Sequence, residues 1–230
     1  MTLRFPVMLF AAGFGTRMGA LTQSRPKPLV EVAGKALLDH ALTLVAEAGG
    51  GRTVVNTHYL GGQIADHLTG RDVAISHEAP DILDTGGGLR NALPLLGQET
   101  VMTLNTDAVW AGPNPLTQLD AAWDPDRMDA LLLCLPKENA LGHKGEGDFI
   151  ATADGPAQRG PGLVYSGVQI IKTGGLWDIA EDAFSLSVLW SDMIARERLY
   201  ILPYAGHWCD VGHPAGITLA EEMLETHGSV

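Results

Sequence analysis

Basic residues are scarce in this sequence, which has 15 lysines and arginines against 27 aspartates and glutamates in 230 residues. The formal net charge of −12 argues against nucleic acid as a partner, because proteins bind its backbone through clustered lysine and arginine. The same charge does not exclude a nucleotide, since a divalent cation can bring a phosphate into an acidic site. Because basic residues are few, a cluster of them in the sequence is informative. Arg17, Arg25 and Lys27 fall within eleven residues.

Long apolar runs are absent and cysteine is rare. No stretch approaches the roughly 20 residues of a membrane-spanning helix, and the first residues have neither the apolar segment nor the cleavage site of a signal peptide. Only Cys134 and Cys209 are present, both in apolar surroundings. We expect reduced thiols in a cytoplasmic protein without membrane contact. Hydrophobic residues still form 46% of the chain, enough for a sizeable core.

One glycine-rich stretch, MLFAAGFGTRMG from Met8 to Gly19, looks like a phosphate-binding loop but matches neither common kind. A Walker A loop ends in Gly-Lys-Ser or Gly-Lys-Thr, and none follows Gly13. A dinucleotide-binding loop has a third glycine that opens a helix. This sequence has Met18 at that position, and two nearby prolines would interrupt the helix.

The order of elements predicts an α/β fold. Short apolar runs indicate buried strands, and apolar residues three or four positions apart indicate helices. The expected strands are 5–12, 52–58, 72–78, 100–107 and 128–136, and the helices between them are 36–50, 61–68 and one from 87 that ends near Pro94. Such alternation implies a Rossmann-like, mostly parallel sheet flanked by helices on both faces.

After Pro136 the pattern changes. Residues 148–155 and 162–171 are expected to pair antiparallel around a turn rich in glycine and proline. Helices near 186–197 and 213–226 and strands 198–203 and 207–211 complete the prediction. Because no repeat or linker divides the chain, we predict a single domain, residues 1–230, with a small antiparallel elaboration.

Glycines and polar residues follow several of the predicted strands. Ligands of open α/β sheets bind outside the carboxyl ends of the strands. The segments at these ends are 11–17, 84–88, 105–107 and 208–212. Glycines let a backbone approach a ligand closely, and converging N–H groups can hold phosphate oxygens. A single glycine cluster is more often an ordinary turn, but two clusters on one edge favour a binding site.

Arg25 and Lys27 alternate with prolines in SRPKPLVEV, residues 24–32. Prolines restrict the backbone, so this segment could hold a cation against a triphosphate. The alternative is a proline-kinked surface loop with solvated basic residues. The overall acidity of the chain favours the first interpretation.

Asp107 and Asp210 are the candidate metal ligands. Mg²⁺ prefers one or two carboxylates, with substrate phosphates and waters as its other ligands. Either aspartate could instead cap a following helix. The segment from His207 to His213 also allows a soft-metal hypothesis with Cys209, although its spacing does not match a structural zinc site. A serine hydrolase is disfavoured because no Gly-x-Ser-x-Gly elbow is present.

These stretches together resemble the sugar-phosphate nucleotidyltransferases, which join a nucleoside triphosphate to a sugar 1-phosphate and release pyrophosphate. FAAGFGTRMG and RPKPLVEVAGKALLDHAL carry the N-terminal signature. LDTGGGL, LNTD, GDF, YSGVQII and HWCDVGHP follow in the order that is typical of the family. The resemblance spans nearly the whole chain and implies the nucleotidyltransferase fold. Residues 1–136 would then mainly bind the nucleotide, and 137–230 would supply the sugar-phosphate side and the second metal ligand.

The resemblance also implies roles for individual residues. Asp107 and Asp210 would hold Mg²⁺, and Arg17 and Lys27 would bind the triphosphate, so that Arg17, Lys27 and Asp107 are the catalytic residues. The nucleotide would contact Ala11, Ala12, Gly13, Gly15, Thr16, Gly86, Gly87 and Asn105, and the sugar would contact Asp148, Ser166 and Gly167.

The sequence departs from the family pattern in three ways. Thr106 precedes the metal-binding aspartate where glycine is usual, which restricts the backbone there. No Glu-Lys-Pro segment supplies the lysine that grips the sugar phosphate, and Arg159 or Lys144 are the candidate replacements. The residues after Asp210 are expected to form one helix and not the left-handed β-helix that some relatives carry.

Within the family, the compact length and the GDF, YSG and HWCDVG motifs most resemble enzymes that use UTP and N-acetylmuramate 1-phosphate in cell-wall recycling, so the resemblance implies UTP and this sugar 1-phosphate as substrates. Guanylyl transfer to mannose 1-phosphate and thymidylyl or uridylyl transfer to glucose 1-phosphate remain alternatives. A catalytically silent nucleotide-binding regulator is the alternative of another class. Both aspartates and Lys27 are present, which favours an enzyme. The oligomeric state cannot be predicted from this sequence.

Overall fold

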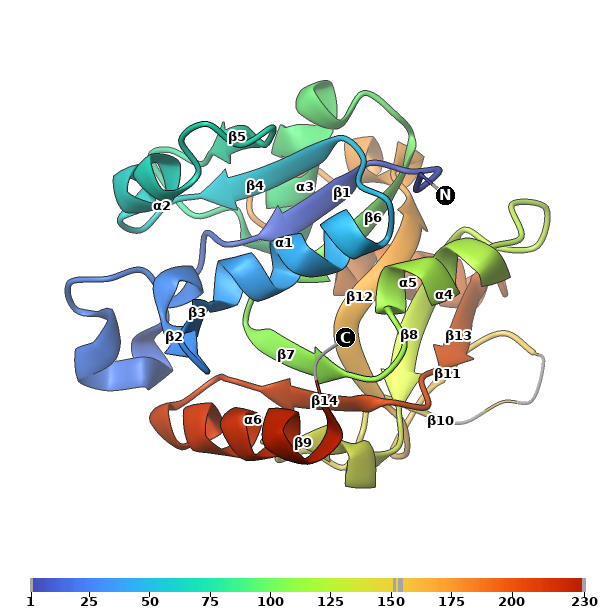
Figure 1. Cartoon of the computed structure of the whole chain (residues 1–230). Helices are drawn as coiled ribbons and strands as arrows, with labels where there is room; N and C mark the ends of the chain where they lie inside the picture. The colour runs from blue at the N-terminus through green and yellow to red at the C-terminus, as the bar shows by residue number, and fades with distance from the viewer. Residues whose placement is uncertain (1, 151, 153–154, 229–230) are drawn as a thin grey trace.

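The computed structural model describes residues 2–150, 152 and 155–228. Its centre is a seven-stranded sheet in the order β13-β8-β12-β6-β1-β4-β5 (Figure 1). The strands are β1 (Val7–Phe10), β4 (Thr53–Thr57), β5 (Ala74–His77), β6 (Thr100–Asn105), β8 (Ala130–Leu135), β12 (Val164–Lys172) and β13 (Leu199–Pro203). All neighbours pair in parallel except β12, which is antiparallel to both β6 and β8.

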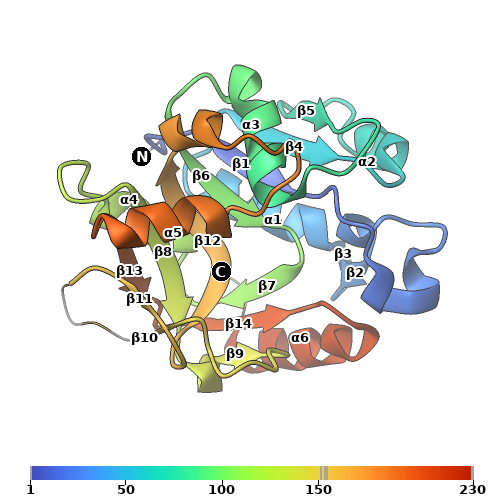
Figure 2. The same ribbon diagram turned by 180° about the vertical axis from the view of Figure 1, so that it is seen from behind.

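Helices cover both faces of this sheet (Figures 1 and 2). One face carries α1 (Leu37–Glu47), α2 (Gly61–His67) and α4 (Pro115–Ala122), and the other carries α3 (Asp84–Leu96) and α5 (Ser187–Ala195). Strands buried on both sides must be apolar along their whole length, and all six residues of β8 are buried. The sheet therefore has a hydrophobic core on each face. Both faces are covered, and a ligand can reach the sheet only at the ends of its strands.

A second, smaller sheet lies beside the central one. It contains β7 (Ala108–Ala111), β14 (His207–Asp210) and β9 (Ala140–Leu141), and α6 (Pro214–His227) packs against it. Two short hairpins complete the fold, β2 (Glu31–Val32) with β3 (Lys35–Ala36) and β10 (Phe149–Ile150) with β11 (Gln158–Arg159). Short 3-10 helices span Thr16–Thr22, which is kinked at Gly19, and Lys27–Leu29, Lys137–Asn139 and Gly174–Asp178.

The predicted α/β class and the mostly parallel sheet are confirmed, with three corrections. The segment predicted to pair with 148–155 instead forms β12 inside the central sheet, and only an isolated bridge joins Phe149 to Leu163. Residues 151 and 153–154 of that prediction lie outside the described residues. β12 is nine residues long and almost fully buried, so its apolar side chains are best covered in the centre.

Helix α3 is the second correction. It begins at Asp84, three residues before the predicted start, and continues to Leu96 past Pro94. A proline in the last turn costs only one helical hydrogen bond, and the left-handed Gly97 then ends the helix by donating to the Leu93 carbonyl. The segment 84–88 is therefore helical and not a glycine-rich loop.

The third correction concerns elements that the sequence prediction missed, of which β7 and α4 bear on the site. β7 follows directly after Asp107, and α4 begins at Pro115. The side chain of Asn114 caps α4 by accepting from two backbone N–H groups, and a proline at the first helical position needs no N–H partner.

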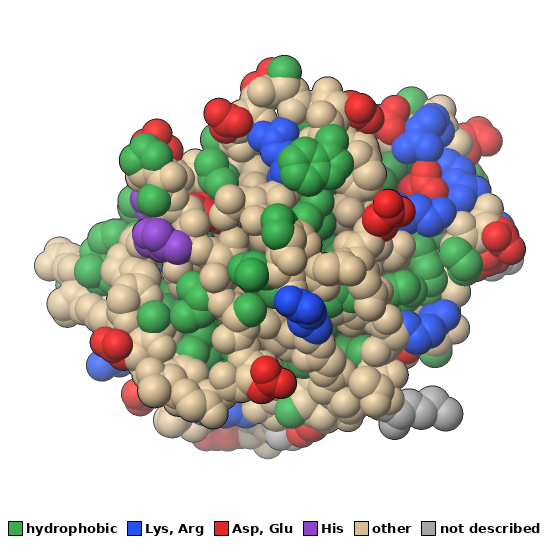
Figure 3. Space-filling view, turned by 90° about the horizontal axis from the view of Figure 1, so that it is seen from above, with side chains coloured by type: hydrophobic (Ala, Val, Ile, Leu, Met, Phe, Trp, Pro, Cys, Tyr) green, Lys and Arg blue, Asp and Glu red, His purple; other side chains and the backbone are tan. Residues whose placement is uncertain are grey.

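The surface agrees with the acidic composition. On the face in Figure 3, the described lysine and arginine side chains lie singly or beside aspartate and glutamate. This face thus shows no broad basic patch among the described residues. None of the helices in the described part of the chain has the length and apolarity of a membrane span.

Candidate active site

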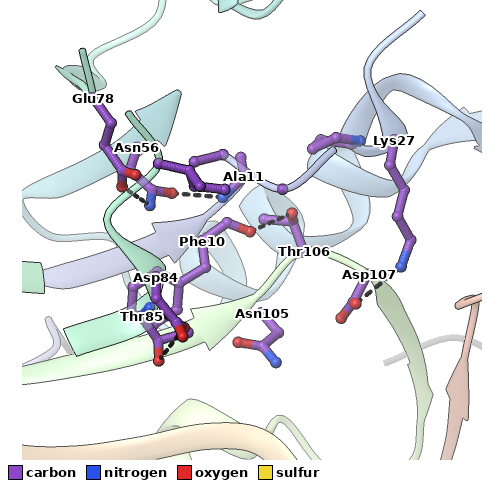
Figure 4. A pocket seen from close by; sticks show the side chains of 14 residues that line it. Phe10, Ala11, Lys27, Asn56, Glu78, Asp84, Thr85, Asn105, Thr106 and Asp107 are labelled. Atoms are coloured by element: carbon purple, nitrogen blue, oxygen red, sulfur yellow. Dashed lines mark hydrogen bonds and ion pairs between the residues drawn. The ribbon is translucent and has the colours of Figure 1, made fainter. Parts of the chain in front are cut away.

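A cavity of about 220 Å³ opens at the carboxyl ends of the central strands. Its walls come from the ends of β1, β4, β5 and β6 and from the start of α3, as the α/β architecture predicts (Figure 4). The residues that line it are Phe10, Ala11, Ala12, Gly13, Lys27, Pro28, Asn56, Glu78, Ile82, Asp84, Thr85, Asn105, Thr106 and Asp107.

The loop after β1 forms one wall of this cavity. Ala11 and Ala12 are buried, whereas Gly13 is exposed, and a Cβ placed there would meet no atom within 4 Å. Gly15 has a φ of +65°, and a Cβ there would lie 2.8 Å from the Cβ of Lys27. Only glycine therefore allows this turn to pack closely against the lysine segment.

Lys27 is buried and ion-paired. Its side chain is 11% exposed, and its Nζ lies 2.9 Å from the Oδ2 of Asp107 (Figure 4). The solvated-loop alternative is therefore wrong for Lys27. The same alternative, a solvated basic side chain, is correct for Arg25, which precedes Lys27 by two positions and is exposed.

Asp107 and Asp210 are brought together by the small sheet. β14 runs antiparallel to β7, so Asp210 pairs with Ala108, and the Val211 N–H donates to the Asp107 carbonyl at 2.8 Å. Burial raises the pKa of Asp210, and the nearby Asp107 carboxylate raises that pKa further. Two hard carboxylates that repel each other are suited to share a divalent cation.

Neither aspartate caps a helix. Asp107 is followed by a strand, and the N-cap of α6 is His213, which makes no side-chain capping bond. The helix-capping alternatives for both aspartates are therefore wrong.

Arg17 lies near the carboxylate of Asp210. A Cβ at Gly212 would lie 3.1 Å from the Nη1 of Arg17 and 2.8 Å from the Oδ2 of Asp210, so both side chains border this glycine. The charges of Lys27 and Arg17 partly offset the rise in the pKa of Asp210. Thr16, which precedes Arg17, is exposed at the start of the 3-10 turn.

The soft-metal hypothesis is not supported. Among the described residues, no group of three or more histidine, cysteine, aspartate or glutamate side chains could hold a metal ion. His207 stacks on His227 with ring centroids 3.8 Å apart. Cys209 is buried, which raises the pKa of its thiol to about 12 and disfavours the thiolate that a metal needs.

The residues predicted for the sugar lie on β12 and beside it. Gly167 has a φ of +84°, and a Cβ there would lie 2.7 Å from the Nδ2 of Asn105, so glycine lets the asparagine lie against the strand. Ser166 is buried and donates to the Leu133 carbonyl at 2.6 Å, which directs its hydroxyl into the sheet. The Oδ2 of Asp148 accepts from the Tyr165 N–H at 2.8 Å.

Gly86 and Gly87 have a different environment from the one predicted. Both N–H groups donate to the carbonyl of Phe184. A Cβ at Gly86 would fall 2.3 Å from the Phe184 ring, and one at Gly87 would fall 2.2 Å from the Asp182 carbonyl oxygen. These glycines let the 182–184 segment pack on α3, and neither lines the cavity.

Asn56 and Glu78 line the cavity and were missed by sequence reasoning. Both are buried polar residues at the ends of β4 and β5. A signal for both was present in the sequence, since each lies at the carboxyl end of a predicted strand, VVN or AISHE, as Asn105 does.

The fold and this site define a nucleotidyltransferase. Residues 7–219 match the MobA-like NTP transferase domain family, and the chain belongs to that family. HddC from Yersinia pseudotuberculosis, solved as a complex with GMP-PN, has the same fold, with a TM-score of 0.76 and 20% identity over 95% of this chain and 98% of that chain.

Two curated relatives are similar over nearly their whole length. The N-acetylmuramate alpha-1-phosphate uridylyltransferase of Caulobacter vibrioides is 40% identical over 94% of this chain and 96% of that protein. A protein of the same name from Neisseria meningitidis serogroup B is 34% identical, covering 89% of this chain and 92% of its own. The predicted class, an enzyme of the sugar-1-phosphate nucleotidyltransferase kind, is confirmed.

Proposed function

We propose that this chain transfers the uridylyl group of UTP to N-acetylmuramate 1-phosphate, giving a UDP-sugar and pyrophosphate. The observation that carries the proposal is the meeting of Lys27, Asp107 and Asp210 beside the cavity. The names of the two curated relatives support the choice of base and sugar. Both substrates are small, and residues 1–136 and 137–230 would serve the nucleotide and the sugar phosphate respectively.

The nucleotide would lie along the β1 loop. Exposed Gly13 leaves space at the wall of the cavity, and the buried backbone of Ala11 and Ala12 supports it. Gly15 and Thr16 would continue this contact, and Asn105 would border the ribose from β6. Gly86 and Gly87 are left out of this proposal because their N–H groups are already bonded.

The reaction needs charge stabilisation more than proton transfer. A sugar-phosphate oxygen attacks the α-phosphorus, and it is already ionised at neutral pH, so no general base is required. Lys27 and Arg17 would bind the triphosphate and stabilise the departing pyrophosphate, the arginine as a fork and the lysine as a point charge.

Asp107 and Asp210 fit a magnesium ion. They supply two hard oxygen donors, Asp107 from directly before β7 and Asp210 from the end of its neighbour β14, and Mg²⁺ commonly takes one or two carboxylates with phosphates and waters. Bound there, the ion would reduce repulsion between the two anionic substrates and stabilise charge in the transition state. The two aspartates would hold it, and Lys27 would keep Asp107 oriented.

The sugar would lie beside Asp148 and Gly167, with Ser166 supporting β12 from within the sheet. Of the two candidate cations for its phosphate or carboxylate, Lys144 is the better placed. It is exposed on the loop after β9, and a Cβ at Gly142 in that loop would lie 2.6 Å from the Asp210 carbonyl oxygen. The guanidinium of Arg159 instead lies over the rings of Phe149 and Trp190.

A substrate panel tests this proposal. UTP, GTP and dTTP are each combined with the 1-phosphates of N-acetylmuramate, glucose and mannose, with Mg²⁺, and pyrophosphate release is measured. We expect UTP with N-acetylmuramate 1-phosphate to give the highest kcat/KM. A preference for GTP with mannose 1-phosphate would establish the guanylyltransferase alternative. Nucleotide binding with no product from any pair would establish the silent regulator.

A further inference from the structure

The peptide unit between Phe10 and Ala11, at the start of the loop, is held from both sides. Its carbonyl accepts from the Thr106 hydroxyl at 2.7 Å and from the Thr106 N–H at 3.4 Å. Its N–H donates to the Oδ1 of Asn56 at 2.6 Å (Figure 4). Threonine thus restrains the loop from β6, and asparagine restrains it from β4.

Glu78 determines which way the Asn56 amide faces. Its Oε1 accepts from the Nδ2 of Asn56 at 2.6 Å, and its Oε2 accepts from the Leu83 N–H at 2.8 Å. A carboxylate can only accept, so it bonds only to the NH₂ end of the amide. The oxygen of Asn56 must then point toward Ala11, which needs an acceptor.

All members of this hydrogen-bonded chain are buried. Asn56 is 3% exposed, Glu78 is 1% exposed and Thr106 is 2% exposed. Gly88 in α3 leaves them room, because a Cβ there would lie 2.5 Å from the Oε1 of Glu78. A donor or acceptor that faces the wrong way in this buried network leaves a polar group without a hydrogen-bond partner, which costs free energy.

We propose that Asn56 and Glu78 are positioning residues for the nucleoside triphosphate. By fixing the plane of the Phe10–Ala11 peptide, they set the direction of the following backbone from Ala12 to Gly13, which forms the cavity wall. The inference rests on the proposed function, in which that wall receives the nucleotide. Under the proposed function the sugar would lie beside Asp148, which accepts from the Tyr165 N–H, so its binding is not expected to depend on this peptide.

The hydrogen-bond polarity of the pair offers a sharp test. Asn56→Asp places two acceptor groups against each other. Glu78→Gln keeps the size but gives the side chain one acceptor and one donor end, so it cannot accept from both Asn56 and Leu83. The double variant reverses the polarity of the link, because the glutamine would donate to the new carboxylate and accept from Leu83, and the carboxylate would accept from Ala11.

We expect each single variant to raise the KM for UTP by roughly ten- to a hundredfold, the cost of one mismatched buried hydrogen bond. The KM for the sugar 1-phosphate should change less than about twofold. The double variant should recover the KM for UTP to within about threefold of the parent chain, a rescue that independent defects would not produce. Thermal unfolding of each variant is measured alongside.

The inference is overturned if Glu78→Gln leaves the KM for UTP unchanged. It is also overturned if that variant raises both KM values equally, or if the double variant is as poor as the two single changes combined. If Asn56→Asp does not fold, Glu78→Gln and the double variant still decide. If the parent chain releases no pyrophosphate with any pair, the proposed function fails instead, and the dissociation constant of UTP measured by calorimetry replaces KM in the same comparison.

Discussion

The ammonium of Lys27 lies 2.9 Å from the Oδ2 of Asp107, although 80 positions separate the two residues in the chain. The proline-flanked turn after the β1 loop places the lysine, and the end of β6 places the aspartate. A lysine with an 11% exposed side chain needs such a partner, because an unpaired buried ammonium is costly. The pair joins the predicted triphosphate-binding segment to the predicted metal ligand.

Asp107→Asn tests the metal ligand. The change keeps the size of the side chain but removes its charge, so Mg²⁺ binding should weaken and kcat should fall by about a thousandfold, which is about 4 kcal/mol in the barrier. The rate is measured by pyrophosphate release over a range of Mg²⁺ concentrations. Asp66→Asn, on the exposed surface of α2, serves as a control. A near-normal rate at limiting Mg²⁺ would contradict the assignment.

Lys27→Ala tests the triphosphate cation. Loss of a charge-assisted bond should raise the KM for UTP by roughly ten- to a hundredfold and lower kcat, with little change in the KM for the sugar 1-phosphate. Arg25→Ala is the matched control, because Arg25 is exposed in the same segment, and it should leave both values nearly unchanged. Equal effects of the two substitutions would show that Lys27 has no special role.

Gly86→Ala distinguishes helix packing from nucleoside contact. The added methyl would meet the Phe184 ring, so the free energy of unfolding should drop by about 1–3 kcal/mol, as overpacking usually causes. The KM for UTP should stay close to that of the parent chain. Urea unfolding measures the first effect and steady-state kinetics the second. Gly62→Ala in α2 meets no atom within 4 Å and should not destabilise. A large rise in KM with unchanged stability would restore the predicted nucleoside contact.

Asp129 gives a pH-dependent contribution to stability. Burial alone would raise its pKa, but hydrogen bonds from Lys172, Arg196 and Arg198 outweigh burial and hold the pKa below its usual 3.8. A lowered folded-state pKa stabilises the protein above about pH 3.8 and loses this effect as pH falls through the folded value.

Asp129→Asn should therefore destabilise the chain at pH 7 and at pH 4.5 by similar amounts, and by less at pH 3. Urea unfolding at the three pH values measures this difference. Asp192→Asn is the control, since Asp192 is exposed and pairs only with Arg196 among these cations. A difference between the parent chain and Asp129→Asn that persists unchanged to pH 3 would disprove the role of this charge.

Much of the site could be predicted from the sequence. Apolar runs predicted β1, β4, β6 and β8, and the alternation with helices predicted the edge where ligands bind. Ala11, Lys27 and Asp107 could be assigned to that edge because each depends on local features, a strand end or a proline-restricted turn. The family resemblance then assigned a chemistry that the comparisons confirm at the level of the class.

Other features were decided only by the tertiary structure. The antiparallel entry of β12 into the central sheet and the pairing of β14 with β7 join segments that are distant in the sequence, and no local pattern encodes such partners. For the same reason the packing role of Gly86 and the link from Glu78 through Asn56 to Ala11 could not be predicted. The sequence by itself determined which residues lie at the strand ends that form the site. Long-range strand pairing and helix packing decided which of these residues contact one another.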